Sequence, residues 1–273
     1  MYYVFNKTCT GYKHIQKRRV CEDYSASYKD NNSIIITCAD GHGGDIYIRS
    51  NVGSRIASDT VMNVFSGLTP RYLNSMSEGE LESQIKMSIL CEWNKLVEQQ
   101  LARKHIKKYE VDGLSEDQIN DLRLNPTIAY GTTLTGAIIV GDKLLVVGIG
   151  DTEAMFLTKG KIEKVFDDDG APAGNITYSM CQEDAFKYLK VRLVSASDYD
   201  GVMLCTDGLV GPYQSYQNFE ENFVKPVFAK IIQTKSQYEV YSLVSSIAAK
   251  LGTGDDVSLS FIFNVNTKLK DYL

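Results

Sequence analysis

Apolar and polar positions along the chain follow two periods, and each period predicts a different kind of element. Residues 34–39 form a short β-branched run between polar residues and glycine, which is typical of a buried strand. Residues 45–65 carry apolar side chains at helical spacing, from Ile48 to Ile56 and beyond, and predict a helix. The strand leads directly to this helix through the sequence DGHGG at residues 40–44.

Serine residues placed three positions before a glutamate predict where other helices begin. Ser77 and Glu80 form such a capping box, and apolar positions at helical spacing follow them. Ser236 and Glu239 form another, and they open a helix predicted over residues 236–251 that ends at the following glycine.

From residue 131 onward the pattern changes to short apolar runs joined by tight turns. Gly141-Asp142-Lys143 and Lys159-Gly160-Lys161 each separate two such runs and predict hairpins. We predict strands at residues 24–28, 133–140, 144–148, 154–158, 162–166, 202–206 and 257–263. Because hairpins pair strands antiparallel, the pattern favours an α+β fold of antiparallel sheets covered by amphipathic helices.

The pattern favours a single domain over residues 1–273. Residues 104–127 are polar and charged, and we interpret them as a surface excursion in which Ser115 and Gln118 cap a short helix. The chain contains no internal repeat and no low-complexity linker. Its length of 273 residues, with 44% hydrophobic residues, is enough to bury one large core.

Charge and composition exclude several classes of protein. A net charge of −5 argues against a dedicated nucleic-acid-binding protein, which would carry a basic face. No apolar segment approaches the ~20 residues of a membrane span, and the start of the chain lacks the pattern of a signal peptide. Six cysteines are scattered without a CxxC pair, which favours reduced thiols over a disulfide framework. We therefore expect a cytoplasmic protein.

Carboxylates recur at the ends of the predicted strands, often beside glycine. Asp40 and Asp207 each follow a strand and precede a glycine, and Asp151 follows a strand through one. Residues 22–23 and 255–256 are acidic pairs that precede strands. An isolated Asp-Gly after a strand is usually only a turn, so the spacing by itself leaves the turn as the commoner interpretation.

If these carboxylates converge, their chemistry indicates a metal site. Several carboxylates in one place repel each other and take up protons unless a cation neutralises them. Oxygen ligands of this kind suit Mg²⁺ or Mn²⁺. Two such ions ~3.5–4 Å apart can lower the pKa of a shared water and direct it at a phosphorus atom.

Six motifs, in order along the chain, resemble those of the metal-dependent serine/threonine protein phosphatases, the PPM or type 2C family. The most specific of them is the sequence ADGHGG. The six are CED at 21–23, ADGHGG at 39–44, GTTL at 131–134, GDT at 150–152, CTDGL at 205–209 and DDVS at 255–258. They look closest to the compact bacterial branch. The resemblance implies two antiparallel β-sheets packed face to face as a sandwich, with helices on the outside.

The resemblance also implies a centre with two Mn²⁺ or Mg²⁺ ions. In it, Asp40 would bridge both ions, and the backbone carbonyl of Gly41 would be a ligand of one. Glu22 and Asp23 would bind from the N-terminal strand, Asp23 mostly through water.

On the other side of this implied centre, Asp207 and Asp255 would hold the second ion. Asp151 would help Asp207 to hold a third, weaker ion. His42 would be the general acid that protonates the leaving serine or threonine oxygen, since imidazole titrates near physiological pH.

An arginine four residues before the acidic pair binds phosphate in many members of the family. Arg18 has that spacing, and Arg19 is the alternative. A guanidinium group suits a phosphate dianion better than an ammonium group does. Residues 17–19 are otherwise a solvated basic turn, and compact bacterial members often lack the arginine.

The sequence departs from the family pattern at three of the motifs. Asp256 stands where the family has an amide, and Glu153 follows the GDT motif where an arginine is expected. Residues 210–212 lack an acid that many members carry. These changes affect the expected substrate preference and third ion more than the central pair. Residues 167–193, with a turn-rich loop at 167–177, fall where the family carries a variable flap, or are a surface loop.

Three functions fit this reading. The first is a monomeric phosphatase that hydrolyses phosphoserine and phosphothreonine in phosphoproteins and opposes a serine/threonine kinase. The second is a pseudophosphatase that binds phosphoproteins or other partners, and the third is a phosphatase of small metabolites. His14 and His105 lie in polar segments, and we interpret both as surface residues rather than ligands.

Overall fold

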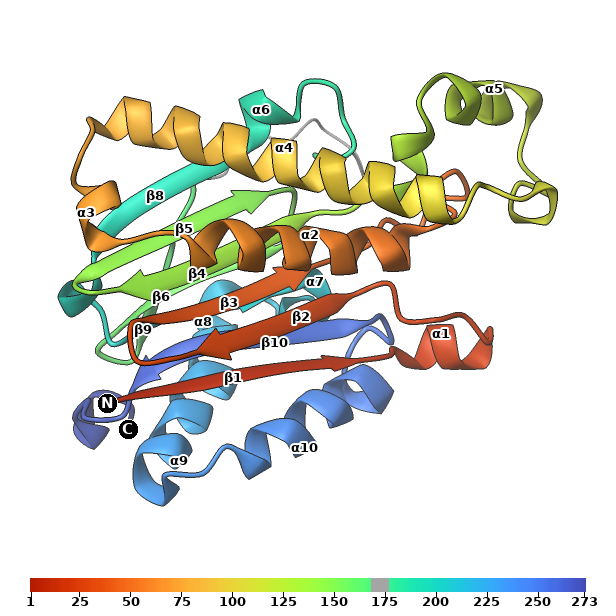
Figure 1. Ribbon diagram of the computed structural model, residues 1–273. Coiled ribbons are helices and arrows are strands. Elements are labelled where there is room, and N and C mark those ends of the chain that lie inside the picture. Colours follow the sequence, from red (N-terminus) through yellow and green to blue (C-terminus); the bar gives the residue numbers. More distant parts are fainter. Residues whose placement is uncertain (168–176) are drawn as a thin grey trace.

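Two five-stranded antiparallel sheets lie face to face, and helices cover their outer faces (Figure 1). The computed structural model describes residues 1–167 and 177–273, apart from the side chains of residues 250 and 251. The first sheet has the order β1 (Tyr2–Cys9), β10 (Val257–Asn264), β9 (Gly201–Cys205), β6 (Glu153–Thr158) and β7 (Lys161–Lys164). The second has the order β2 (Tyr24–Lys29), β3 (Ser33–Ala39), β4 (Leu134–Val140), β5 (Lys143–Ile149) and β8 (Lys190–Ser195). The α+β sandwich expected from the sequence is confirmed.

Three apolar clusters hold these layers together. The middle cluster lies between the sheets and includes Ile36, Val146 and Leu204. The outer clusters lie between each sheet and its helices. Because Ile35 and Ile36 point to opposite faces and are both buried, the central strand β3 is apolar without alternation.

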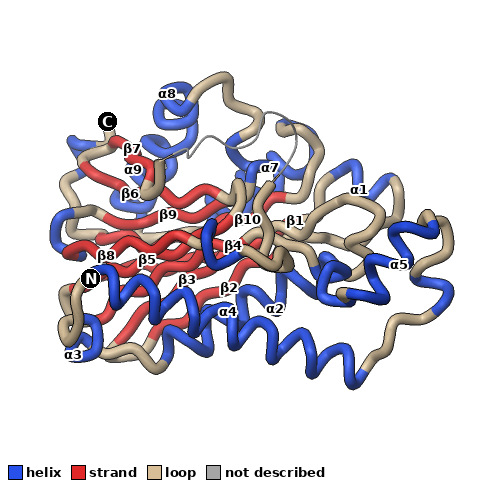
Figure 2. Tube along the Cα trace, turned by 90° about the horizontal axis from the view of Figure 1, so that it is seen from above, coloured by secondary structure: helices blue, strands red, loops and turns tan. Residues whose placement is uncertain are grey.

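Helices α2 (Ser50–Ser66) and α4 (Glu78–Arg103) cover the second sheet, and α9 (Lys225–Thr234) covers the first (Figure 2). α10 (Tyr238–Ser246) lies on the same side as α9 (Figure 1). The structure also contains several short helices. They are α1 (Tyr12–Gln16), α3 (Pro70–Leu73), α5 (Glu116–Leu124), α6 (Ala185–Tyr188), α7 (Asp207–Val210) and α8 (Tyr216–Phe219). Among the described residues, no helix combines the length and apolar character of a membrane-spanning segment.

Both predicted hairpins are present. Lys143 opens β5 directly after the turn at Gly141, and Lys159 and Gly160 join β6 to β7 with positive φ angles of 50° and 76°. Two consecutive positive φ angles match the right-handed twist of the strands in a two-residue hairpin. The predicted capping boxes that start α4 and α5 also form.

Two helix predictions were wrong in detail. The helix expected from residue 45 begins at Ser50, because residues 45–49 form an irregular loop after β3. The capping box expected at Ser236 does not form: Ser236 accepts a hydrogen bond from the N–H of Tyr238, and Glu239 pairs with Lys230 at 3.3 Å. α10 therefore begins at Tyr238 and closes with a π-helical turn.

Residues 104–127 contain α5 and are anchored to the body by one buried arginine. Arg49 donates hydrogen bonds to both carboxylate oxygens of Glu110, at 2.8 and 3.0 Å, and to the carbonyl of Lys104 at 2.7 Å. It also donates to the hydroxyl of Tyr130 at 2.6 Å. In the segment compared with a flap, residues 168–176 lie outside the described residues, and residues 190–195 form β8.

Candidate active site

A cavity of about 530 Å³ lies at one end of the sandwich, where strands of both sheets begin or end. Antiparallel pairing produces this arrangement, because the end of one strand lies beside the start of the next. Tyr24 at the start of β2 pairs with Ala39 at the end of β3, and Cys205 at the end of β9 pairs with Leu259 near the start of β10. Acidic residues that are far apart in the sequence are thereby brought to one place.

The loop after β3 is fixed by backbone hydrogen bonds on both sides of Asp40. The carbonyl of Asp40 accepts hydrogen bonds from the N–H of Thr133 at 2.9 Å and the hydroxyl of Thr132 at 2.8 Å. The N–H of Gly41 donates to the carbonyl of Glu22 at 3.1 Å. A Cβ at Gly41 would lie 2.7 Å from that carbonyl oxygen, so a side chain cannot be accommodated there.

The acidic side chains of the site are held at a cost in electrostatic energy. Asp23 is buried and accepts a hydrogen bond from the Thr206 hydroxyl at 2.7 Å, and burial raises its pKa to about 8. Burial, followed by the charges of Asp23, Asp207 and Asp151, raises the pKa of Asp40 far above its ordinary value. The pKa of Asp207 is raised by burial and then by the neighbouring carboxylates. These groups repel one another and favour a cation among them.

His42 faces the cavity from the same loop. Its backbone N–H donates to the carbonyl of Gly131 at 3.1 Å. Its ring packs against Tyr47 in an edge-to-face arrangement, with 4.9 Å between the ring centroids. Burial lowers the pKa of the imidazole, so the ring is neutral near pH 7. Its Nε2 atom is buried and has no hydrogen-bond partner among the described residues.

Most of the residues singled out in the sequence line this cavity. They are Glu22, Asp40, Gly41, His42, Asp151, Asp207 and Asp255. Asp23 lies behind them, buried against Thr206. Arg18 is exposed, has a positive φ of 53°, and is not among the lining residues. Arg19 instead contacts Glu22, with 3.2 Å between Nη2 and Oε1.

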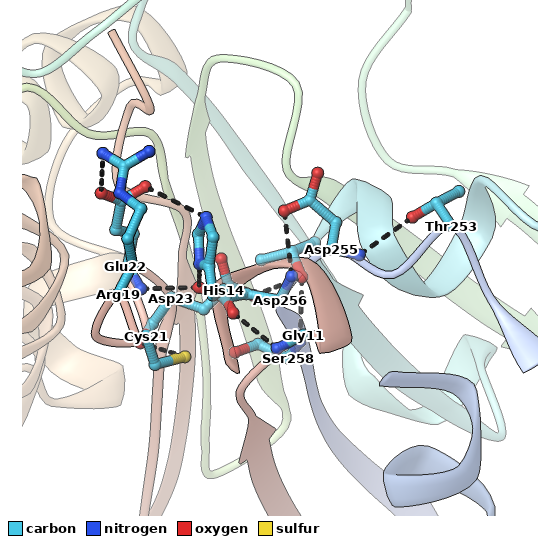
Figure 3. A network of polar contacts seen from close by, with 11 residues as sticks. Gly11, His14, Arg19, Cys21, Glu22, Asp23, Thr253, Asp255, Asp256 and Ser258 are labelled. Carbon is cyan, nitrogen blue, oxygen red and sulfur yellow. Dashed lines mark hydrogen bonds and ion pairs between the residues drawn. The ribbon is translucent and has the colours of Figure 1, made fainter. Parts of the chain in front are cut away.

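One residue of the cavity contradicts the sequence-based interpretation. His14 was expected on the surface, but its side chain is only 12% exposed and lines the cavity beside Glu22 and Asp256 (Figure 3). His105 is exposed, as expected. No local pattern marks His14, because its place depends on how the turn after β1 packs on the start of β10. Tyr47 and Gln182 also line the cavity and were not predicted from the sequence.

The donor set fits a hard divalent cation in its chemistry. The described lining contains carboxylates and two histidines but no lysine or arginine. Among the described residues, no three His, Cys, Asp or Glu side chains are arranged to hold a metal ion as they stand. The carboxylates of Asp23 and Asp40 nevertheless lie close enough for the charge of Asp23 to raise the pKa of Asp40, and a cation between them would relieve this repulsion.

Comparison with known proteins agrees with the motifs in the sequence. The profile of the protein phosphatase 2C family matches residues 10–251. The chain belongs to this family. No curated protein sequence matches the chain.

Solved structures of serine and serine/threonine phosphatases share the fold. A bacterial serine phosphatase is 17% identical with a TM-score of 0.62, and the match covers 96% of this chain and 98% of that one. The phosphatase Stp1 from Staphylococcus aureus is 16% identical with a TM-score of 0.60, over 96% and 95% of the two chains. The catalytic domain of PstP, crystallised with two manganese ions, is 17% identical with a TM-score of 0.59, over 96% and 97%.

Proposed function

We propose that this type 2C family member is an active metal-dependent phosphatase that hydrolyses phosphoserine and phosphothreonine in proteins. The observation that carries the proposal is the convergence of Glu22, Asp40, Asp207 and Asp255 on one cavity with His42. The strands of both sheets supply these acids, so the arrangement is a property of the fold and not of one turn.

Glu22, Asp23, Asp40, Asp207 and the carbonyl of Gly41 would hold two Mn²⁺ or Mg²⁺ ions together with Asp255. Asp151 would help to hold a third. Bound divalent ions supply charge neutralisation for the phosphate and a water of lowered pKa. The ligand set explains why the cavity tolerates so many carboxylates, since their repulsion disappears when a cation lies among them.

His42 would give a proton to the leaving oxygen. Its pKa is lowered by burial in the free protein, but a phosphate dianion in the cavity would raise that pKa and favour the charged ring. His42 lines the cavity, and its buried Nε2 has no hydrogen-bond partner among the described residues, so this nitrogen is not committed to another group. Tyr47 packs against the ring, and the carbonyl of Gly131 fixes the backbone of His42.

No arginine of the described lining is placed to bind the phosphate. The described lining contains no arginine, and Arg19, the nearer candidate, is hydrogen-bonded to Glu22. The phosphate would therefore rest mainly on the bound cations. The surface around the cavity would then decide whether a phosphoprotein or a small phosphate ester binds.

Substrate comparison tests the proposal. Hydrolysis of a phosphothreonine peptide should exceed that of sugar phosphates and nucleotides at equal concentration, with Mn²⁺ or Mg²⁺ present, and should cease with EDTA. Faster hydrolysis of a sugar phosphate would indicate a metabolite phosphatase. Mn²⁺ binding by calorimetry without turnover of any ester would indicate a phosphoprotein-binding pseudophosphatase.

A further inference from the structure

Asp256 joins three segments of the chain immediately beside the cavity (Figure 3). Its Oδ1 accepts a hydrogen bond from the N–H of Gly11 at 2.7 Å, and its Oδ2 accepts one from the N–H of Glu22 at 2.6 Å. The same Oδ2 lies 2.9 Å from Nδ1 of His14. The residue is only 4% exposed, so these contacts satisfy a buried carboxylate.

The contacts of Asp256 require a carboxylate and not an amide. Two backbone donors approach two different oxygens, and a backbone N–H can only donate. An asparagine has one acceptor oxygen and one NH₂ group, so it would set its own donor against the N–H of Gly11 or of Glu22. The acid at this position, where the resemblance led us to expect an amide, is therefore matched to its surroundings.

His14 is the third partner of Asp256, and we call the contacts of Asp256 with Gly11, His14 and Glu22 the junction. Since a carboxylate only accepts, Nδ1 of His14 donates to Asp256, and this bond fixes the ring. Its Nε2 then lies 3.8 Å from Oε2 of Glu22. Arg19 donates to the other oxygen of the same carboxylate at 3.2 Å. The Glu22 carboxylate thus lies between Arg19, which binds one oxygen, and the ring of His14, which lies near the other.

The junction also fixes Asp255. The N–H of Asp256 donates to Oδ1 of Asp255 at 3.0 Å. A Cβ at Gly11 would lie 2.2 Å from the carbonyl carbon of Asp255, so the two backbones are packed without space for a side chain. Acidic residues from the two ends of the chain are therefore set relative to each other at this point.

We propose that Asp256 and His14 are positioning residues that hold Glu22 and Asp255 in the geometry needed to bind metal. This inference rests on the proposed metal-dependent function. Partners that orient metal ligands through hydrogen bonds typically change metal affinity by about 10–100-fold when they are replaced. Neither residue has to touch the ion or the phosphate for this effect.

Metal titration of two variants tests the role of Asp256. Calorimetry with Mn²⁺ alone should show about 10–100-fold weaker binding for Asp256→Asn than for the wild-type protein. Asp200→Asn is the matched control. Asp200 also accepts hydrogen bonds from a backbone N–H (Lys159) and from side chains (Thr267 and Tyr272), but it lies at the other end of β9. It should leave the Mn²⁺ affinity unchanged.

Two variants of His14 test whether its imidazole contributes to metal binding. They can be used even if Asp256→Asn does not fold. His14→Ala should weaken Mn²⁺ binding, whereas His14→Asn should restore most of it, because the asparagine NH₂ can occupy the position of Nδ1. Wild-type affinity in both Asp256→Asn and His14→Ala would overturn this inference alone. A wild-type protein that binds no Mn²⁺ would overturn the proposed metal centre as well.

Discussion

At the scale of single residues, the environment of His42 separates it from the other histidines. Its ring is packed against Tyr47, its backbone is hydrogen-bonded to Gly131, and its buried Nε2 has no hydrogen-bond partner among the described residues. His105 is exposed. The role of His42 as proton donor can therefore be tested with His105 as a matched, exposed control.

Replacement of His42 by glutamine should affect substrates according to their leaving group. A serine or threonine alkoxide needs a proton as the ester bond breaks, whereas nitrophenolate leaves without one. Turnover of a phosphothreonine peptide by His42→Gln should fall about 10²–10⁴-fold, the usual contribution of a general acid. Turnover of p-nitrophenyl phosphate should fall much less, and His105→Gln should behave as wild type. An equal loss for both esters would contradict the assignment.

Residue-level prediction from the sequence succeeded where a motif carries its own geometry. Asp40, Gly41 and His42 follow a buried strand, and their short spacing alone puts them at its end. The position of His14 could not be predicted this way. It depends on Asp256, 242 residues away in the sequence, and on the packing of α1 against the start of β10.

At the scale of elements, the loop between β3 and α2 organises the surroundings of the site. Its last residue, Arg49, donates hydrogen bonds to Glu110, Lys104 and Tyr130, and its N–H donates to the carbonyl of Ala129 at 2.8 Å. These contacts attach the segment that carries α5 to the loop. Tyr130 also precedes Gly131, whose carbonyl accepts the hydrogen bond from the backbone of His42. The loop and the excursion therefore form one unit.

Loss of this arginine should destabilise the protein. Arg49→Met keeps the length of the side chain but removes the donor to Oε1 of Glu110 and to two backbone carbonyl groups, so we expect a loss of about 2–3 kcal/mol in the free energy of unfolding. Lys95→Met, which breaks an exposed pair with Glu92, should cost under about 1 kcal/mol. Urea denaturation measures both, and equal stability of the two variants would contradict the role of Arg49.

The same contact predicts a dependence on acid. Hydrogen bonds from Arg49, with a smaller contribution from the backbone of Lys107, hold the pKa of Glu110 below its ordinary value of 4.5. The stabilisation is therefore present above pH 4.5 and is lost as the pH falls through the lowered pKa of the folded protein. In Arg49→Met, this part of the acid dependence should be reduced.

Burial on both faces made the central strands predictable. The central strands β3, β4 and β5 are buried on both faces and appear in the sequence as apolar runs. The edge strands β1 and β8 are only partly buried, mix polar and apolar residues, and were not predicted. Tertiary pairing, which the local pattern does not contain, determines them.

At the scale of the whole molecule, the two sheets meet in the cavity. Asp40 comes from the second sheet, whereas Asp207 and Asp255 come from the ends of neighbouring strands in the first. The antiparallel order of strands was predictable from the hairpins, but the pairing of β1 with β10 across the length of the chain was not. This long-range pairing brings the N-terminal acidic pair to the C-terminal one.

The most direct test of the central claim is the hydrolysis of a phosphothreonine peptide with Mn²⁺ by the wild-type protein, Asp40→Asn and Asp45→Asn. Asp45 is exposed, lies five residues further along the same loop, and does not line the cavity, so it is a matched control. We predict Mn²⁺-dependent turnover in the wild type and Asp45→Asn, and none above background in folded Asp40→Asn. Turnover by Asp40→Asn within a few-fold of the wild type would contradict the proposed metal centre.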